Sequence, residues 1–101
     1  MATKRALVLE LKDNVANVLE DVEPQDEVSA QLGKESRSLI AIERIPFGFK
    51  MAIVDIPKEG VVFKYGEAIG IASQDIKKGS LVHVHNIGGA RGRGDLEAAK
   101  A

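Results

Sequence analysis

The chain has 101 residues, enough to bury one hydrophobic core but too few for a core plus a separate cofactor domain. Fourteen basic and 15 acidic residues give a formal net charge of -1, so no overall field attracts nucleic acid or an anionic membrane. The absence of cysteine excludes disulfides, thiolate catalysis and thiolate-held metal sites from this chain. No apolar run approaches the roughly 18 to 20 residues of a membrane span, and we expect a cytoplasmic protein.

Short apolar stretches separated by Gly, Pro and Asp predict a mostly β fold of the α+β class, with one or two short helices. The first strand is expected over residues 6–11. Alternation along this strand places Leu7, Leu9 and Leu11 on one face, packed on the core, while Glu10 faces outward.

The best helix candidate follows this strand. Asp13 precedes Val15, Val18 and Leu19 at helical spacing, so the pattern predicts a helix of about two turns that Asp13 caps and that ends at Glu20. The polar stretch 27–37 contains Gly33 and is typical of a hairpin or loop, and residues 39–45 are again strand-like.

A short pattern recurs three times along the chain. Each copy has an Asp followed by a β-branched residue, then a turn, then a valine seven positions after the Asp; the copies begin at Asp21, Asp55 and Asp75. An Asp in this position accepts hydrogen bonds from turn amides, while the branched residue packs in the core. The repetition predicts a compact barrel built from similar strand-turn-strand corners.

Candidate binding residues occur in two segments. In residues 45–52, Gly48 permits an unusual backbone conformation, and Lys50 is a fixed positive charge suited to a carboxylate or sulfonate. In residues 64–70, Tyr65 offers a phenol near a bend. The alternatives are an ordinary tight turn with a solvated lysine, and a strand entrance with a half-buried tyrosine.

Both histidines of the chain lie in the segment 81–86. If this segment is a strand, Val82 and Val84 point to the core while His83 and His85 share the opposite face. Such a pair suits a metal ion, general acid and base catalysis, or hydrogen bonds to a hydroxy acid. A metal site lacks its third ligand here, so we expect none from this chain alone. Two exposed histidines on a polar face are the alternative.

The domain is expected to cover residues 1–87, and a flexible Gly/Arg-rich tail to cover 88–101. Within the tail, Arg91 and Arg93 are suited to clamping an anionic group, because a guanidinium matches a carboxylate in a bidentate manner.

The stretches 45–52, 65–72 and 75–86 together resemble the altronate and galactarate dehydratase family, in particular its small amino-terminal SAF domain. The ending Val82-His83-Val84-His85-Asn86 is the most specific part of the resemblance. It implies a small SAF-like β-clip or barrel domain. It also implies a small subunit, similar to the alpha subunit of sulfolactate sulfo-lyase, that acts with a large catalytic subunit.

The activity implied by the resemblance is a metal-dependent elimination next to a carboxylate, in which water or sulfite leaves a small hydroxy acid. Iron (Fe2+) is expected in the assembled enzyme, held mainly by the large subunit, and no metal ligand is assigned to this chain. The site residues carried over are His83 and His85 in the catalytic role, with Lys50, Tyr65, Asn86, Arg91 and Arg93 as substrate-binding residues.

One departure from the family concerns the substrate. Sugar-acid members typically carry a histidine where this chain has Phe49, which leaves room for a smaller substrate such as sulfolactate. The main alternative function is a stand-alone, non-catalytic module that binds sugar acids or other anions. An RNA-binding role for the Arg-Gly tail is disfavoured, since four aromatic residues and a slightly acidic balance make a poor stacking platform.

Overall fold

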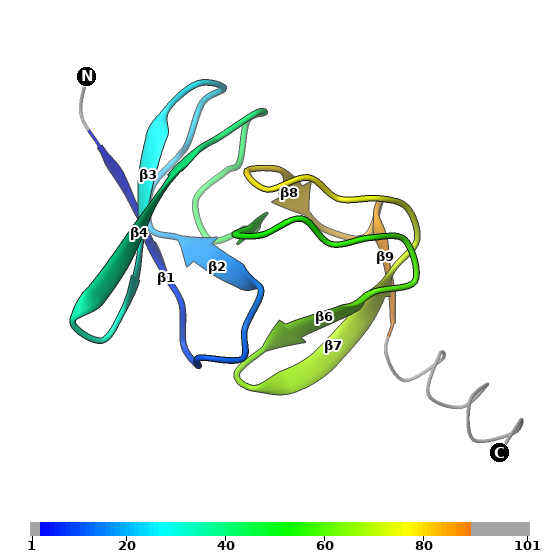
Figure 1. Cartoon of the computed structure of the whole chain (residues 1–101). Coiled ribbons are helices and arrows are strands. Elements are labelled where there is room, and N and C mark those ends of the chain that lie inside the picture. The colour runs from blue at the N-terminus through cyan, green and yellow to red at the C-terminus, as the bar shows by residue number, and fades with distance from the viewer. Residues whose placement is uncertain (1–2, 90–101) are drawn as a thin grey trace, which may run out of the picture.

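The computed structural model describes residues 3–89, which form nine strands and no helix. The strands are β1 (Lys4–Leu7), β2 (Val15–Val18), β3 (Glu27–Leu32), β4 (Glu35–Ile40), β5 (Lys50–Ala52), β6 (Val61–Lys64), β7 (Glu67–Ala72), β8 (Leu81–Val82) and β9 (Ile87–Gly89). They make a six-stranded sheet, in the order β4-β3-β1-β2-β5-β8, and a three-stranded sheet, in the order β6-β7-β9. In Figure 1 the β3–β4 hairpin and the β6–β7 hairpin lie on opposite sides of β2. The predicted mostly β class is confirmed.

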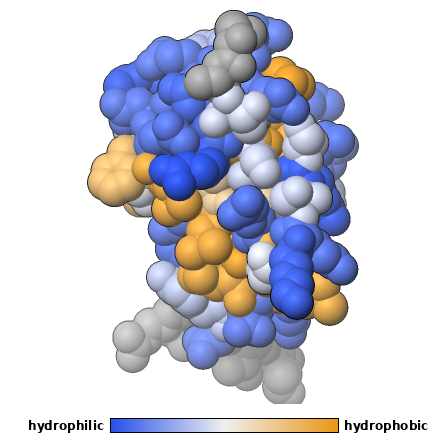
Figure 2. All heavy atoms as spheres, turned by 90° about the vertical axis from the view of Figure 1, so that its left-hand side faces the viewer, coloured by the Kyte–Doolittle hydropathy of each residue, from blue (hydrophilic) through white to orange (hydrophobic). Residues whose placement is uncertain are grey.

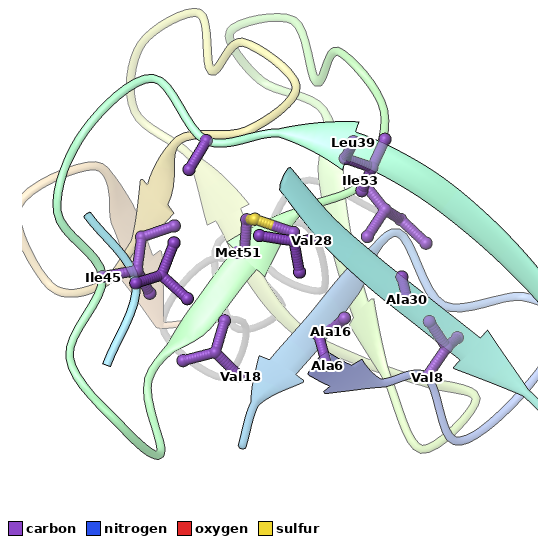
Figure 3. Packing of buried hydrophobic residues seen from close by; sticks show 12 residues of the cluster. Ala6, Val8, Ala16, Val18, Val28, Ala30, Leu39, Ile45, Met51 and Ile53 are labelled. Carbon is purple, nitrogen blue, oxygen red and sulfur yellow. The ribbon is translucent and has the colours of Figure 1, made fainter. Parts of the chain in front are cut away.

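Two hydrophobic clusters form the core, and strands β2 and β5 belong to both. Ala16 and Val18 of β2 and Met51 of β5 pack in the larger cluster, with Met51 next to Val28 in Figure 3. Val15 of β2 and Ala52 of β5 pack in the smaller cluster, together with residues of β6, β7 and β8. Neighbouring residues of each strand therefore point into different clusters, and β2 and β5 are covered on both faces.

The prediction of a helix over residues 13–20 is wrong, because residues 15–18 form strand β2. The apolar spacing that suggested a helix arises from a strand buried on both faces, which lacks simple alternation. Asp13 does not cap a helix. Its buried carboxylate accepts hydrogen bonds from the backbone N–H groups of Glu10 (3.1 Å), Tyr65 (3.0 Å) and Gly66 (2.7 Å), and so ties residues 10–13 to the β6–β7 turn.

The face assigned to the first strand is also wrong. Ala6 and Val8 are buried, whereas Leu7 is 40% exposed and Leu11 is 86% exposed. Strand β1 lies between β2 and β3, and its register places Ala6 beside Ala30 of β3. The neighbouring core residues Ala16 and Ala30 are also small, and Leu7 and Leu11 lie on the outer face.

The hairpin alternative for residues 27–37 is confirmed. Strands β3 and β4 are six residues each and antiparallel, and Gly33 in their turn has a positive φ of 61°. The strand expected over 39–45 is correct only at its start, since β4 ends at Ile40. At the other end of the chain, β9 pairs with β7, so Gly88 and Gly89 lie in a strand where the sequence predicts tail.

The three repeated corners are present, and the structure adds a fourth. We define the corners as residues 21–26, 44–49, 55–60 and 75–80. Their branched residues form isolated bridges in two pairs, Val22 with Ile45 and Ile56 with Ile76. In each corner the fifth residue has a positive φ and its N–H donates to a backbone carbonyl elsewhere in the sheet; these residues are Gln25, Gly48, Glu59 and Gly79.

Aspartates join the corners of a pair. Asp55 Oδ1 accepts a hydrogen bond from the N–H of Lys78 (2.9 Å), and Asp75 Oδ1 accepts one from the N–H of Lys58 (2.8 Å). In the other pair only one such bond exists, from the N–H of Phe47 to Asp21 Oδ1 (2.8 Å). This explains why the Asp-based pattern finds three copies and not four.

The second hydrogen bond of this pair is absent because neither its acceptor nor its donor is present. Arg44 stands where the other three corners have Asp, and Pro24, which has no N–H, stands where the others have the amide donor. Because the donor and the acceptor are both replaced, no turn amide in this pair loses a carboxylate partner. The dipeptide Ile45-Pro46, which matches Ile56-Pro57, is the sequence signal that identifies the fourth corner.

Candidate functional site

Strands β5 and β8 bring Lys50 and His83 to neighbouring positions. Lys50 is the first residue of β5, and its register partners are Asn17 of β2 and Val82 of β8. His83 directly follows Val82 at the end of β8. The two residues are therefore close along the backbone, but their side chains lie on opposite faces of the sheet: Lys50 shares the face of Val82, which packs in the smaller cluster, whereas His83 packs on Phe49 beside the larger cluster.

The imidazole of His83 packs against the ring of Phe49. The ring centroids are 4.7 Å apart with an interplanar angle of 54°, and Phe49 itself is partly buried against the larger core cluster. The core thus supports Phe49, and Phe49 covers one side of the imidazole. A ring contact of this kind restricts the orientation of the imidazole, and His83 remains partly exposed.

The strand expected over residues 81–86 ends at Val82, and residues 83–86 turn back. The carbonyl of His83 accepts hydrogen bonds from the N–H groups of Asn86 (3.0 Å) and Ile87 (3.1 Å). Val84 is 78% exposed and does not point to the core, and His85 is exposed at the turn. The expectation that both histidines share one strand face is therefore wrong.

Asn86 supplies the physical reason for this turn. Its Oδ1 accepts a hydrogen bond from the N–H of His83 (2.9 Å), and its Nδ2 donates to the carbonyl of Leu81 (2.8 Å). Its side chain is used within the turn, and the residue is only 4% exposed. A side chain closing its own loop in this way competes with continued strand pairing. In this structure Asn86 positions the backbone of His83, and its predicted contact with a substrate stays a prediction.

Of the remaining predicted binding residues the structure describes only Tyr65, which lies between two strands of the three-stranded sheet. Tyr65 lies in the β6–β7 turn with a positive φ of 61°, and its exposed ring contacts the amine of Lys64, 4.8 Å from the ring centroid. Arg91 and Arg93 lie outside the described residues. Their roles stay predictions.

Lys50 carries an uncompensated charge. Its side chain is half-buried, and burial, together with the positive charge of Lys64, lowers the pKa of its amine. Among residues 3–89 the ion pairs within 4 Å involve Lys4, Arg5 and Arg44 as the basic partners, and Lys50 takes part in none of them. A half-buried cation without a carboxylate partner is a suitable binding group for an external anion.

Replacing this lysine by methionine is expected to stabilise the fold. A pKa that is lower in the folded than in the unfolded chain means that Lys50 lowers the free energy of unfolding at neutral pH. This cost disappears as the pH rises from the folded pKa to the unfolded one. Since the group is partly solvated, we expect Lys50→Met to raise the free energy of unfolding by less than about 1 kcal/mol.

Denaturant unfolding at pH 7 and at higher pH measures this effect, with Lys78→Met as the matched control at an exposed corner position. The gain for Lys50→Met should shrink as the pH approaches the ordinary lysine range, whereas the control should change little at either pH. A variant less stable than the parent at pH 7 would contradict the assigned electrostatic cost.

A shallow cavity of about 210 Å³ lies elsewhere on the domain. Apolar side chains form most of its lining, with Glu35 and Arg37 at its polar part and Ile53 on the side of β5. None of the predicted site residues within 3–89 lines it. Figure 2 shows the side of the molecule that carries β3 and β4, where apolar side chains gather in the middle of a largely hydrophilic face.

Within residues 3–89 no three His, Asp or Glu side chains come together where they could hold a metal ion. In the same residues no helix is long and apolar enough to cross a bilayer.

The two-sheet architecture with its paired corners defines a small β domain of the β-clip type. Residues 4–90 match the family model described as the altronate/galactarate dehydratase SAF domain. The chain belongs to this family, as the sequence resemblance indicates.

Relatives carry names of two related activities. The chain is 39% identical to altronate dehydratase of Escherichia coli (strain K12) over 74 residues, which are 73% of this chain and 14% of that protein. It is 34% identical to altronate dehydratase of Bacillus subtilis (strain 168) over 83 residues, 82% of this chain and 16% of that protein. It is 44% identical over 45 residues to (2R)-sulfolactate sulfo-lyase subunit alpha of Chromohalobacter salexigens, 45% of this chain and 48% of that protein. The chain therefore spans less than half the length of each of these relatives.

Proposed function

We propose that this chain is the small subunit of a metal-dependent lyase and acts with a large catalytic subunit in the cytoplasm. The reaction is an elimination next to a carboxylate, with water or sulfite as the leaving group. The observation that carries the proposal is the match of residues 4–90 to the SAF domain of the dehydratase family, and the half-buried Lys50, which has no ion-pair partner among the described residues, supplies a group that can bind an anion.

The chemistry requires a base for the α proton, a positive group for the developing enolate and an acid for the leaving group. Lys50 binds the substrate carboxylate, and His83 or His85 holds or moves a proton at an imidazole nitrogen. The described residues do not offer a three-ligand metal site, so we assign the iron to the large subunit. When bound there, iron supplies a Lewis acid.

The substrate is a small hydroxy acid, either a sugar acid such as altronate or galactarate, or sulfolactate. Phe49 favours the smaller substrate, because its ring covers one side of His83 with an apolar surface. A polar residue in its place would offer a hydrogen bond to a further hydroxyl group of a sugar acid. The relative named as a sulfo-lyase alpha subunit supports the two-subunit arrangement.

The test is reconstitution with a large lyase chain encoded in the same genome. We expect the small chain alone to release neither sulfite from sulfolactate nor water from altronate or galactarate, and the iron-loaded mixture to turn over one of them. Size-exclusion chromatography of the mixture measures complex formation. Full activity of the isolated chain, or no association with any such large chain, would contradict the proposal.

The second candidate is a stand-alone module that binds sugar acids or other anions. The same uncompensated charge of Lys50 favours it. Calorimetry on the isolated chain, followed by the reconstitution, separates the two: binding without any activity in the mixture supports the module.

A further inference from the structure

We propose that Glu43 is a positioning residue for His83, because its carboxylate fixes the strand from which the histidine turn begins. His83 holds or moves a proton in the proposed function, on which this inference rests. Glu43 lies in the connection between β4 and β5, and neither the sequence patterns nor the family resemblance singles it out.

The backbone of this connection is anchored on both sides of Glu43. Ala41 and Ile45 are fully buried, and their N–H groups donate to backbone carbonyls of the 21–26 corner at 2.9 and 2.8 Å. Glu43 lies midway between these two anchors and is itself partly buried. Its side chain therefore leaves the backbone from a defined position.

The carboxylate of Glu43 bonds the open edge of β8. Among the described strands β8 pairs only with β5, so one of its edges has no neighbouring strand. There the N–H of Leu81 donates to Glu43 Oε2 (2.9 Å), and the carbonyl of Leu81 accepts from Asn86 Nδ2 (2.8 Å). A hydrogen bond to a carboxylate is stronger than one between neutral groups. Two side chains thus take the place of a neighbouring strand and hold both backbone polar groups of Leu81.

The same contacts continue from Leu81 to His83. Asn86, which bonds the carbonyl of Leu81, accepts the N–H of His83 with its Oδ1 (2.9 Å). The imidazole packs against Phe49, which is supported separately by the larger core cluster. A shift of Leu81 therefore displaces His83 relative to the Phe49 ring. Because a small misplacement of a catalytic group lowers the rate strongly, Glu43 affects turnover without taking part in the proton transfer.

The test compares three variants of the isolated full-length chain. Glu43→Gln keeps an acceptor oxygen but loses the charge, Glu43→Asp keeps the charge but shortens the side chain, and Glu43→Ala removes the acceptor. NMR measures the imidazole signals of His83 and its NOEs to the Phe49 ring, with His85→Ala to assign the two histidines. We expect parent-like NOEs in Glu43→Gln, and shifted signals with weaker NOEs in the other two variants.

Kinetics of the reconstituted complex give the second measurement. Glu43→Ala should lower kcat by roughly 10-fold with little change in KM, as expected for a misplaced catalytic group, whereas Glu43→Gln should retain most of the parent kcat. The matched control is Glu20→Ala, which removes another carboxylate bond to a backbone N–H, that of Arg5 (2.9 Å) in β1, a strand that does not pair with β8. This control should change neither the His83 signals nor kcat.

Two results would overturn the inference. One is parent-like His83 signals and NOEs in both Glu43→Asp and Glu43→Ala, and Glu43→Asp decides alone if the alanine variant does not fold. The other is a Glu43→Gln variant as impaired as Glu43→Ala, since the charge and not the hydrogen bond would then act on His83. A displaced His83 in a chain that activates no large partner would leave the positioning role intact and refute the proposed function. An active complex whose variants keep the parent signals and rate would do the reverse.

Discussion

Replacing both His83 and His85 by alanine is expected to lower kcat of the reconstituted complex by about 100-fold to 10,000-fold, the usual contribution of a positioned acid or base. Assembly should be unaffected, because His85 is an exposed turn residue and His83 contributes one ring contact to Phe49. Steady-state kinetics and size-exclusion chromatography of the same samples measure the two properties.

Single variants show how much each histidine contributes to the loss of kcat. The imidazole of His83 packs against Phe49, whereas His85 is exposed at the turn, so His83→Ala should account for most of the loss. Val84→Ala is the matched control in the same turn, since its side chain is 78% exposed. If the double variant turned over normally, both histidines would be structural and the proton transfer would belong to the large subunit.

The largest expected effect on stability comes from Gly79→Ala. Gly79 has a φ of +92°, and a Cβ added there would meet the backbone oxygen of Ile40 at 2.3 Å. The N–H of Gly79 donates to Ala52, and its carbonyl accepts from Ile42, so the backbone is held on both sides. We expect a loss of about 3 kcal/mol or more, because strain and a backbone clash act together.

Gly48→Ala separates these two causes. Gly48 occupies the equivalent position of another corner with a φ of +86°, but a Cβ there would meet nothing within 4 Å. Its cost should be about 1 to 2 kcal/mol, the price of a left-handed conformation alone. Denaturant unfolding of both variants measures the difference. Equal losses would show that the 75–80 corner moves away from Ile40 without significant cost.

The sequence was sufficient for the fold class and for three of the four corners, but not for the faces of the strands. The Asp-turn pattern depends on local chemistry, and three of its copies are visible without a structure. The faces of β1 and β2 depend on neighbours far away in the chain: Ala30 beside Ala6, and a second core cluster behind Val15. Local periodicity carries no information about such neighbours, and the predicted helix failed for this reason.

For the candidate site, the sequence singled out Lys50 and His83 as candidates, but it did not predict the contacts that the structure gives them. The alternation rule paired His83 with His85, and the side chain of Asn86 overrides it by closing the turn. The junction of the two sheets at Asn14 is likewise hidden in the sequence, because its hydrogen bonds reach residues 47 and 49 positions away. No local motif encodes a contact over that distance.

Because β2 and β5 are covered on both faces, they lie between the two hydrophobic clusters and contribute side chains to both. Displacing Met51, which packs in the larger cluster, moves the backbone of Lys50 and Ala52, whose side chains face the smaller cluster. Binding at Lys50 and packing of the two clusters are therefore mechanically linked through the three residues of β5. A partner that contacts either cluster therefore affects the orientation of the Lys50 amine.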